Sequence, residues 1–140
     1  MPHHDFTGEW LMTGSELLSE LLIELNVGWI KRQAASAMGY GVGKVRQTVS
    51  QTGDLITVEQ KGGQKDFTNV IKVGGGPQQL DSADGMVPVT ATWAPDGSLK
   101  METEMMGAKV TVTRRRTDDK RTVIEIDTGK IVATRIFSKQ

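Results

Sequence analysis

Regularly spaced turn signals constrain this chain more than any other feature of its sequence. After Tyr40, short segments rich in glycine, proline or aspartate interrupt the chain roughly every ten residues, the spacing typical of strands joined by tight turns. The segments between them contain many Val, Thr and Ile residues, which favour strands. The turn signals are TGD at 52–54, KGG at 61–63, GGGP at 74–77, ADG at 83–85, PDG at 95–97, TDDK at 117–120 and TGK at 128–130.

The residues before Tyr40 follow a different pattern. Residues 5–13 predict a first strand centred on Trp10. Leucines then recur at helical spacing between Leu17 and Leu25, with Ser15 as the expected N-cap, and a second short helix follows an interruption at residues 26–28. This pattern predicts a helix-turn-helix lid over residues 15–36.

Together these patterns predict about ten strands, a number at which a single sheet tends to curl or close. From the residues alone, up-and-down hairpins in a sandwich or in a barrel both fit. No linker or low-complexity tract divides the chain, so we expect residues 1–140 to form one domain.

Composition argues against several classes of function. Lysine plus arginine and aspartate plus glutamate both number 17, so no net charge directs the chain to nucleic acid. Because cysteine is absent, disulfides, thiolate metal sites and a cysteine nucleophile are excluded. His3 and His4 are the only histidines, on a terminus where we expect disorder, so none remains for a triad or a metal site in the sheet. We therefore expect no enzyme, no metal and no cofactor.

The first ten residues contain neither a basic start nor an apolar segment. We therefore expect a cytoplasmic protein, and a nuclear fraction stays open for a chain of this size.

Polar residues on both faces of the strands leave two interpretations of the interior open. Thr, Ser and Gln occur throughout segments such as TVSQT and VTATW. Thr is a good strand former, which would explain the pattern without any function. Alternatively, the sheet encloses a partly hydrated space, as larger barrels do.

The segment 131–138 places an arginine on an apolar strand face. Arg135 alternates in register with Ile131, Ala133 and Phe137. A buried arginine keeps its charge and needs an anionic partner. A surface position for Arg135 also fits, because the opposite face of this strand is half apolar as well.

Three consecutive arginines at 114–116 form the other basic feature. Successive strand residues point to opposite faces, so the three cannot form one patch, and we expect no nucleic-acid binding. Alternation with Val110 and Val112 groups Arg114 and Arg116 with the apolar face. The register of this strand therefore decides which arginine points inward.

Several segments in this order resemble the intracellular lipid-binding proteins, a family that includes the fatty-acid-binding and the cellular retinoid-binding proteins. The resemblance runs from Phe6 to Lys139, and its most specific pieces are the helical segment at 25–36 and the last segment at 131–137. The matching segments are FTGEW at 6–10, LNVGWIKRQAAS at 25–36, GDLITVEQ at 53–60, IKVG at 71–74, VPVTATW at 87–93, DGSLKME at 96–102 and IVATRIF at 131–137.

The resemblance implies a mainly β fold: a ten-stranded antiparallel up-and-down β-barrel, related to the lipocalins, capped by the helix-turn-helix lid. In the acid-binding branch of the family, two arginines and a tyrosine hold the ligand carboxylate. The matching positions here are Arg135, Arg115 and Phe137, so the resemblance selects Arg115, with Thr113, where alternation selects Arg114. Phe137 lacks the hydroxyl group of the usual tyrosine.

The resemblance also assigns residues to the cavity and its entrance: Leu18 and Trp29 from the lid, Thr113 from the wall, and Gln64 from the turn between the third and fourth strands. It implies a monomeric carrier that reversibly binds a hydrophobic carboxylate, with a long-chain fatty acid expected first and retinoic acid as the alternative. We further expect transient membrane contact through the helical lid.

Overall fold

A computed structural model describes residues 3–83 and 85–140. Within these ranges the chain forms ten strands, two α-helices and one 3-10 turn, so the expected mainly β class is confirmed. Asp84, at the centre of the expected ADG turn, lies outside the described residues. The elements are β1 (Gly8–Glu16), α1 (Leu18–Glu24), α2 (Trp29–Ala37), η1 (Gly39–Gly41), β2 (Arg46–Thr52), β3 (Leu55–Lys61), β4 (Phe67–Lys72), β5 (Gln78–Ser82), β6 (Gly85–Trp93), β7 (Leu99–Met105), β8 (Ala108–Asp118), β9 (Arg121–Asp127) and β10 (Val132–Lys139).

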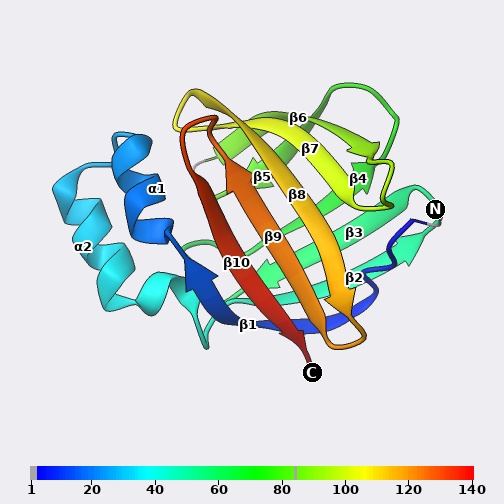
Figure 1. Ribbon diagram of the computed structural model, residues 1–140, viewed down its shortest axis with the longest axis horizontal. Coiled ribbons are helices and arrows are strands. Elements are labelled where there is room, and N and C mark those ends of the chain that lie inside the picture. The colour runs from blue at the N-terminus through cyan, green and yellow to red at the C-terminus, as the bar shows by residue number, and fades with distance from the viewer. Residues whose placement is uncertain (1–2, 84) are drawn as a thin grey trace.

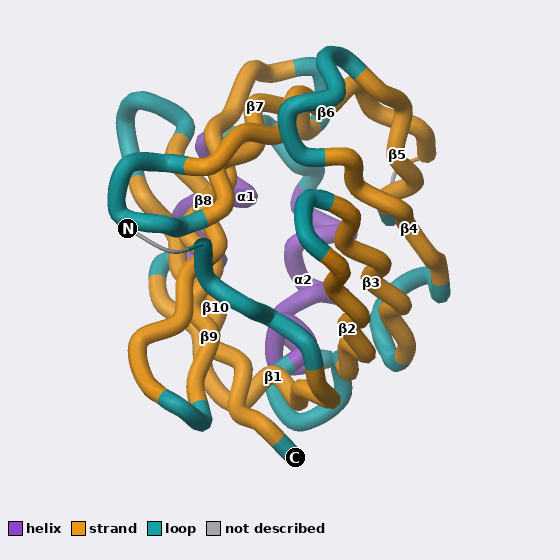
Figure 2. Tube along the Cα trace, turned by 90° about the vertical axis from the view of Figure 1, so that its right-hand side faces the viewer, coloured by secondary structure: helices purple, strands orange, loops and turns teal. Residues whose placement is uncertain are grey.

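The strands form one antiparallel sheet that curves into a nearly closed barrel. Neighbours in the sheet are neighbours in sequence, except that β1 pairs with β10 and leaves β4 and β5 as the two edges. The strands run around the molecule, and the two helices lie across one end of it (Figures 1 and 2). The expected up-and-down barrel with a helical lid is therefore confirmed, and the sandwich is not.

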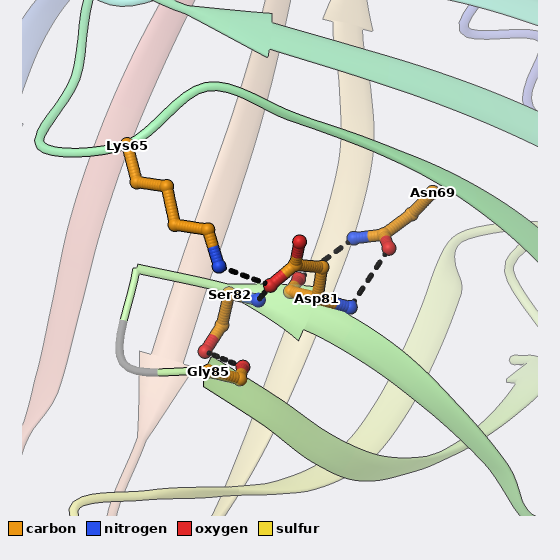
Figure 3. A network of polar contacts seen from close by, with 5 residues as sticks. All are labelled: Lys65, Asn69, Asp81, Ser82 and Gly85. Atoms are coloured by element: carbon orange, nitrogen blue, oxygen red, sulfur yellow. Dashed lines mark hydrogen bonds and ion pairs between the residues drawn. The ribbon is translucent and has the colours of Figure 1, made fainter.

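Side-chain amides bridge the gap between the two edge strands. Asn69 of β4 donates to the carbonyl of Asp81 on β5 at 2.8 Å and accepts from the Asp81 amide at 2.9 Å. Gln78 of β5 makes the same reciprocal pair with the backbone of Lys72 on β4, at 2.9 and 3.0 Å. Lys65 adds an ion pair to Asp81 at 2.8 Å (Figure 3). Side chains thus supply here the hydrogen bonds that backbone groups exchange elsewhere in the sheet.

Two groups of buried apolar side chains divide the interior. The larger one lines the barrel and includes Phe6, Trp10 and Phe137, none of which is exposed. The smaller one joins Leu21 and Leu25 of the helical segment to strands β8, β9 and β10. The lid is therefore held to the barrel mainly through α1, because α2 buries none of its residues.

The lid begins later than its sequence predicts. Ser15 is not an N-cap but the next-to-last residue of β1, where it pairs with Arg135. Leu17 precedes α1 in the left-handed region, with φ 59°, and no side chain caps the helix. Pairing with β10 extends β1 beyond the expected end at residue 13 and shifts the first helix. None of the described helices is long and apolar enough to cross a membrane.

The N-terminal segment is ordered, contrary to the expectation for His3 and His4. The His3 ring stacks on Trp93 with centroids 4.2 Å apart. The His4 backbone amide donates to Gly97 at 2.8 Å, and its ring Nδ1 accepts from the Arg116 amide at 3.0 Å. These contacts reach the end of β6, the β6–β7 turn and β8, so the segment lies across the barrel end opposite the helices (Figure 2).

We expect the Gln78 bridge to stabilise the barrel measurably. Gln78→Leu removes both hydrogen bonds to Lys72 and should lower the free energy of unfolding by about 1 kcal/mol, since each such bond has a modest net value. Urea denaturation checks this, with amide exchange at Lys72 as a local readout. The matched control is Gln79→Leu, because Gln79 is the exposed neighbour. Equal effects of the two substitutions would contradict a role for the bridge.

Candidate functional site

One row of side chains brings two arginines together inside the barrel. Arg135 of β10 and Arg114 of β8 both lie opposite Ile124 of β9, and Arg114 also lies opposite Leu99 of β7. Directly opposed residues point to the same face of a sheet. Since Leu99 and Ile124 are buried core residues, both arginines point inward. Their backbones lie two strand spacings apart, about 10 Å.

Arg114 is almost completely enclosed, with 4% of its surface exposed. Its Nη2 donates to the side-chain oxygen of Gln47 at 2.7 Å, and its guanidinium carbon lies 5.3 Å from the centre of the Phe6 ring. The buried Nε of Arg114 has no hydrogen-bond partner. A charged group is therefore held by a single neutral acceptor and an aromatic face.

The neighbours of the Arg135 guanidinium group are a thioether and an aromatic ring. Its Nη2 is 3.7 Å from the sulfur of Met12, and its guanidinium carbon is 5.2 Å from the centre of the Phe137 ring. Arg135 is half-buried, and because it points inward, its remaining accessible surface faces the interior of the barrel. Sulfur is a weak acceptor, so this guanidinium group keeps most of its hydrogen-bonding capacity.

The two cations have no carboxylate to neutralise them. Over residues 3–83 and 85–140, neither Arg114 nor Arg135 takes part in an ion pair. Burial, and then the positive charge of Arg135, lowers the pKa of Arg114 to about 9. Burial alone lowers the pKa of Arg135 to about 10. Both groups stay charged at neutral pH, where they together favour a bound anion.

The placement of Arg115 and Thr113 in the interior is corrected by the structure. Both belong to the outer face of β8, because Thr113 lies opposite Glu125 and Arg115 opposite Val123, while Arg114 lies between them on the inner face. Arg115, 35% exposed, forms an ion pair with Glu125 on this outer face. The register implied by the family resemblance was one residue off, and the alternation with Val110 and Val112 gave the correct face.

The other expected site residues are divided between the interior and the lid end. Phe137 is fully buried next to Arg135, as its register predicts. Leu18 packs against both groups of buried side chains, at the junction of lid and barrel. Trp29, by contrast, is 65% exposed on α2. Gln64 is exposed in the β3–β4 turn, at the same end of the barrel as the helices.

Two interior glutamines were missed by the sequence analysis. Gln47 of β2 and Gln60 of β3 lie directly opposite each other and are both buried. The side-chain amide of Gln47 donates to Gln60 at 2.9 Å. Their signal was the alternation of Gln47 with Val45 and Val49, which assigns Gln47 to the apolar face of its strand.

Several inward-facing side chains keep accessible surface. Met101 and Val112 lie opposite each other in the row of the buried residues Ala91 and Ile126, yet both are only partly buried. Arg135 behaves in the same way. An interior packed solid would bury such residues completely, so packing is incomplete around these three side chains.

A separate concavity of about 510 Å³ lies along strands β6 to β9, and the buried residues Val89 and Val110 are part of its lining. Its lining includes Thr90, Glu102, Thr111 and Asp127, which form one row on the outer face of strands β6 to β9. It contains neither arginine, so it is not the site described above. In the described part of the chain, no group of three or more His, Cys, Asp or Glu residues could hold a metal ion.

Comparison with known proteins shows similarity to fatty-acid-binding proteins over nearly the whole chain. The chain is 28% identical over 134 residues to human fatty acid-binding protein 9, covering 96% of both chains. It is 25% identical, with the same coverage, to the adipocyte fatty acid-binding protein of Pygoscelis papua. No family model matches the chain. The similarity agrees with the barrel and the helical lid, and both relatives are named as binding proteins.

Removal of an interior charge should not destabilise the empty protein. In Arg135→Met, a cation without an anionic partner is replaced by an apolar side chain of similar length, so the free energy of unfolding should hold or rise. The control Arg115→Met removes a partly exposed ion pair on the outer face and should cost about 0–1 kcal/mol. Urea denaturation of both variants without ligand checks this. A loss of more than about 1 kcal/mol in Arg135→Met would contradict an unpaired interior charge.

Proposed function

We propose that this protein is a carrier that reversibly binds a long-chain fatty acid, with the carboxylate at Arg114 and Arg135 inside the barrel. The observation that carries the proposal is the pair of inward-facing arginines without a carboxylate partner. Charge-assisted hydrogen bonds from guanidinium groups to a carboxylate are short and strong. An acid ligand would supply the missing anion.

The apolar tail would supply most of the affinity. Burial of each methylene group contributes about 0.8 kcal/mol, so a long acyl chain gains more free energy than its head group. The partly accessible Met101 and Val112 are available for such contacts. The arginines would then select an acid over a neutral lipid and fix its orientation. Both relatives are named as fatty acid-binding proteins, which supports a fatty acid as the ligand.

The arginines should distinguish acids from alcohols. Arg135→Met and Arg114→Met should each weaken oleate binding by about 2–5 kcal/mol, since each removes one partner of a buried charge pair. Oleyl alcohol should lose much less affinity, because it brings no charge. Calorimetric titration with both ligands checks this, and retinoic acid tests the alternative ligand with the same head group.

The control for this experiment is Arg115→Met, which alters the same strand on its outer face. It should leave oleate affinity nearly unchanged, because Arg115 pairs with Glu125 outside the barrel. If Arg115→Met weakens oleate binding as much as Arg114→Met, the head-group site is misplaced. If acid and alcohol bind equally to the unaltered protein, the carboxylate mechanism is wrong.

We also propose that α2 contacts membrane surfaces when the ligand is exchanged. Trp29 and Ile30 are 65% and 78% exposed at its start, and the only charged residues of the helix, Lys31 and Arg32, follow directly. Exposed apolar side chains next to basic ones suit the interface of a bilayer that contains anionic lipids.

The double substitution Trp29→Ser with Ile30→Ser should slow oleate transfer to vesicles of phosphatidylcholine and phosphatidylserine severalfold. Its equilibrium affinity for oleate should change little, because α2 buries none of its residues. Stopped-flow transfer assays check this, with Leu55→Ser as the control for an exposed apolar residue on the barrel. Equal transfer rates for both variants would contradict a membrane role for α2.

A further inference from the structure

We propose that Gln47 occupies the place of the ligand carboxylate on Arg114 in the empty protein and is displaced when an acid binds. The inference rests on the proposed function and makes Gln47 a residue that sets affinity. It follows from the contacts of Arg114 and from the series of hydrogen bonds that runs from Arg114 through Gln47 to Gln60.

The side-chain oxygen of Gln47 accepts a hydrogen bond from Arg114, as a carboxylate oxygen of a ligand would. The Gln47 oxygen lies 2.7 Å from Nη2 of Arg114, and both side chains are buried. In the chain as described, Arg114 makes no ion pair and its Nε has no hydrogen-bond partner. The geometry of this contact is that of one arm of an arginine–carboxylate pair, with a neutral amide in the place of the acid.

The charge of Arg114 also fixes how both glutamines point. A guanidinium group has no acceptor, so Gln47 must turn its oxygen towards Arg114 and its NH₂ group away. That NH₂ group donates to the oxygen of Gln60 at 2.9 Å, which leaves the NH₂ group of Gln60 at the end of the series. A Cβ atom at Gly63 would lie 3.4 Å from this nitrogen, so the series ends beneath the β3–β4 turn.

A carboxylate should win the competition for Arg114. A carboxylate can accept two parallel hydrogen bonds from one guanidinium group, and its negative charge attracts the buried cation, which a neutral amide oxygen does not do. The ligand must nevertheless replace a contact that already exists, so Gln47 lowers the net gain on binding. In the empty protein the same contact offsets part of the cost of burying a cation without an anion. The hydrogen bond between Gln47 and Arg114 therefore has two effects: it stabilises the empty barrel and it weakens ligand binding.

Substitutions at Gln47 should change stability and affinity in opposite directions. Gln47→Leu removes the internal competitor, so oleate affinity should rise about tenfold, the value of one hydrogen bond. The urea midpoint of the empty protein should fall. Gln47→Glu supplies Arg114 with a permanent carboxylate, so the empty protein should become more stable and oleate should bind at least about tenfold more weakly. Oleyl alcohol affinity should change less in both variants.

Gln60→Leu is the matched control, because it leaves the contact between Gln47 and Arg114 intact. It should change oleate affinity less than Gln47→Leu does. In NMR spectra of the unaltered protein, the side-chain amide signals of Gln47 and Gln60 should shift when oleate is added.

Defined outcomes overturn the proposal. If the unaltered protein prefers oleate to oleyl alcohol but Gln47→Leu binds oleate with equal or lower affinity, Gln47 positions Arg114 in the complex and is not displaced. Gln47→Glu keeps the test valid if Gln47→Leu does not fold, since unchanged oleate affinity in that variant also overturns displacement. If the unaltered protein shows no preference for oleate, the proposed function itself fails.

Discussion

The burial of two like charges on one face of one sheet is the constraint on which the interior of this protein depends. Arg114 and Arg135 lie in the same cross-strand row, so the pleat of the sheet turns both inward. Neither has an acid among the described residues, and the remaining contacts are an amide, a thioether and two aromatic rings. These partners are all neutral, so they do not neutralise the arginine charges, which remain available to a bound anion.

Much of the fold could be predicted from local sequence because glycine, proline and aspartate residues mark the turns. The strand count, the antiparallel order and the lid follow from turn spacing and from a change of period near Tyr40. The predicted ends of the helices and strands were less accurate. The sequence around Ser15 looks like a helix start, yet pairing with β10 keeps it in β1. Such long-range pairing is not visible in a local pattern.

The candidate site shows where local patterns succeed and where they do not. Alternation grouped Arg114 and Arg135 with the apolar faces of their segments, since a strand has a period of two, while a surface position for Arg135 stayed open. The resemblance shifted the choice to Arg115 by one residue, which on a strand reverses the face. Gln47 and Gln60 come together only because β2 and β3 pair in one register. The contact between Gln47 and Arg114 of β8, across the barrel, depends on closure of the whole sheet.

The amide bridges between β4 and β5 also bear on how this protein behaves at high concentration. A sheet edge with free backbone groups is a template for another chain to pair with, and it promotes aggregation. Asn69 and Gln78 occupy backbone donors and acceptors on both edges, at Asp81 and Lys72. Many proteins protect an edge with charge or proline. Here Asn69 and Gln78 tie the two edges to each other, so the backbone groups of Asp81 and Lys72 are not free to pair with another molecule.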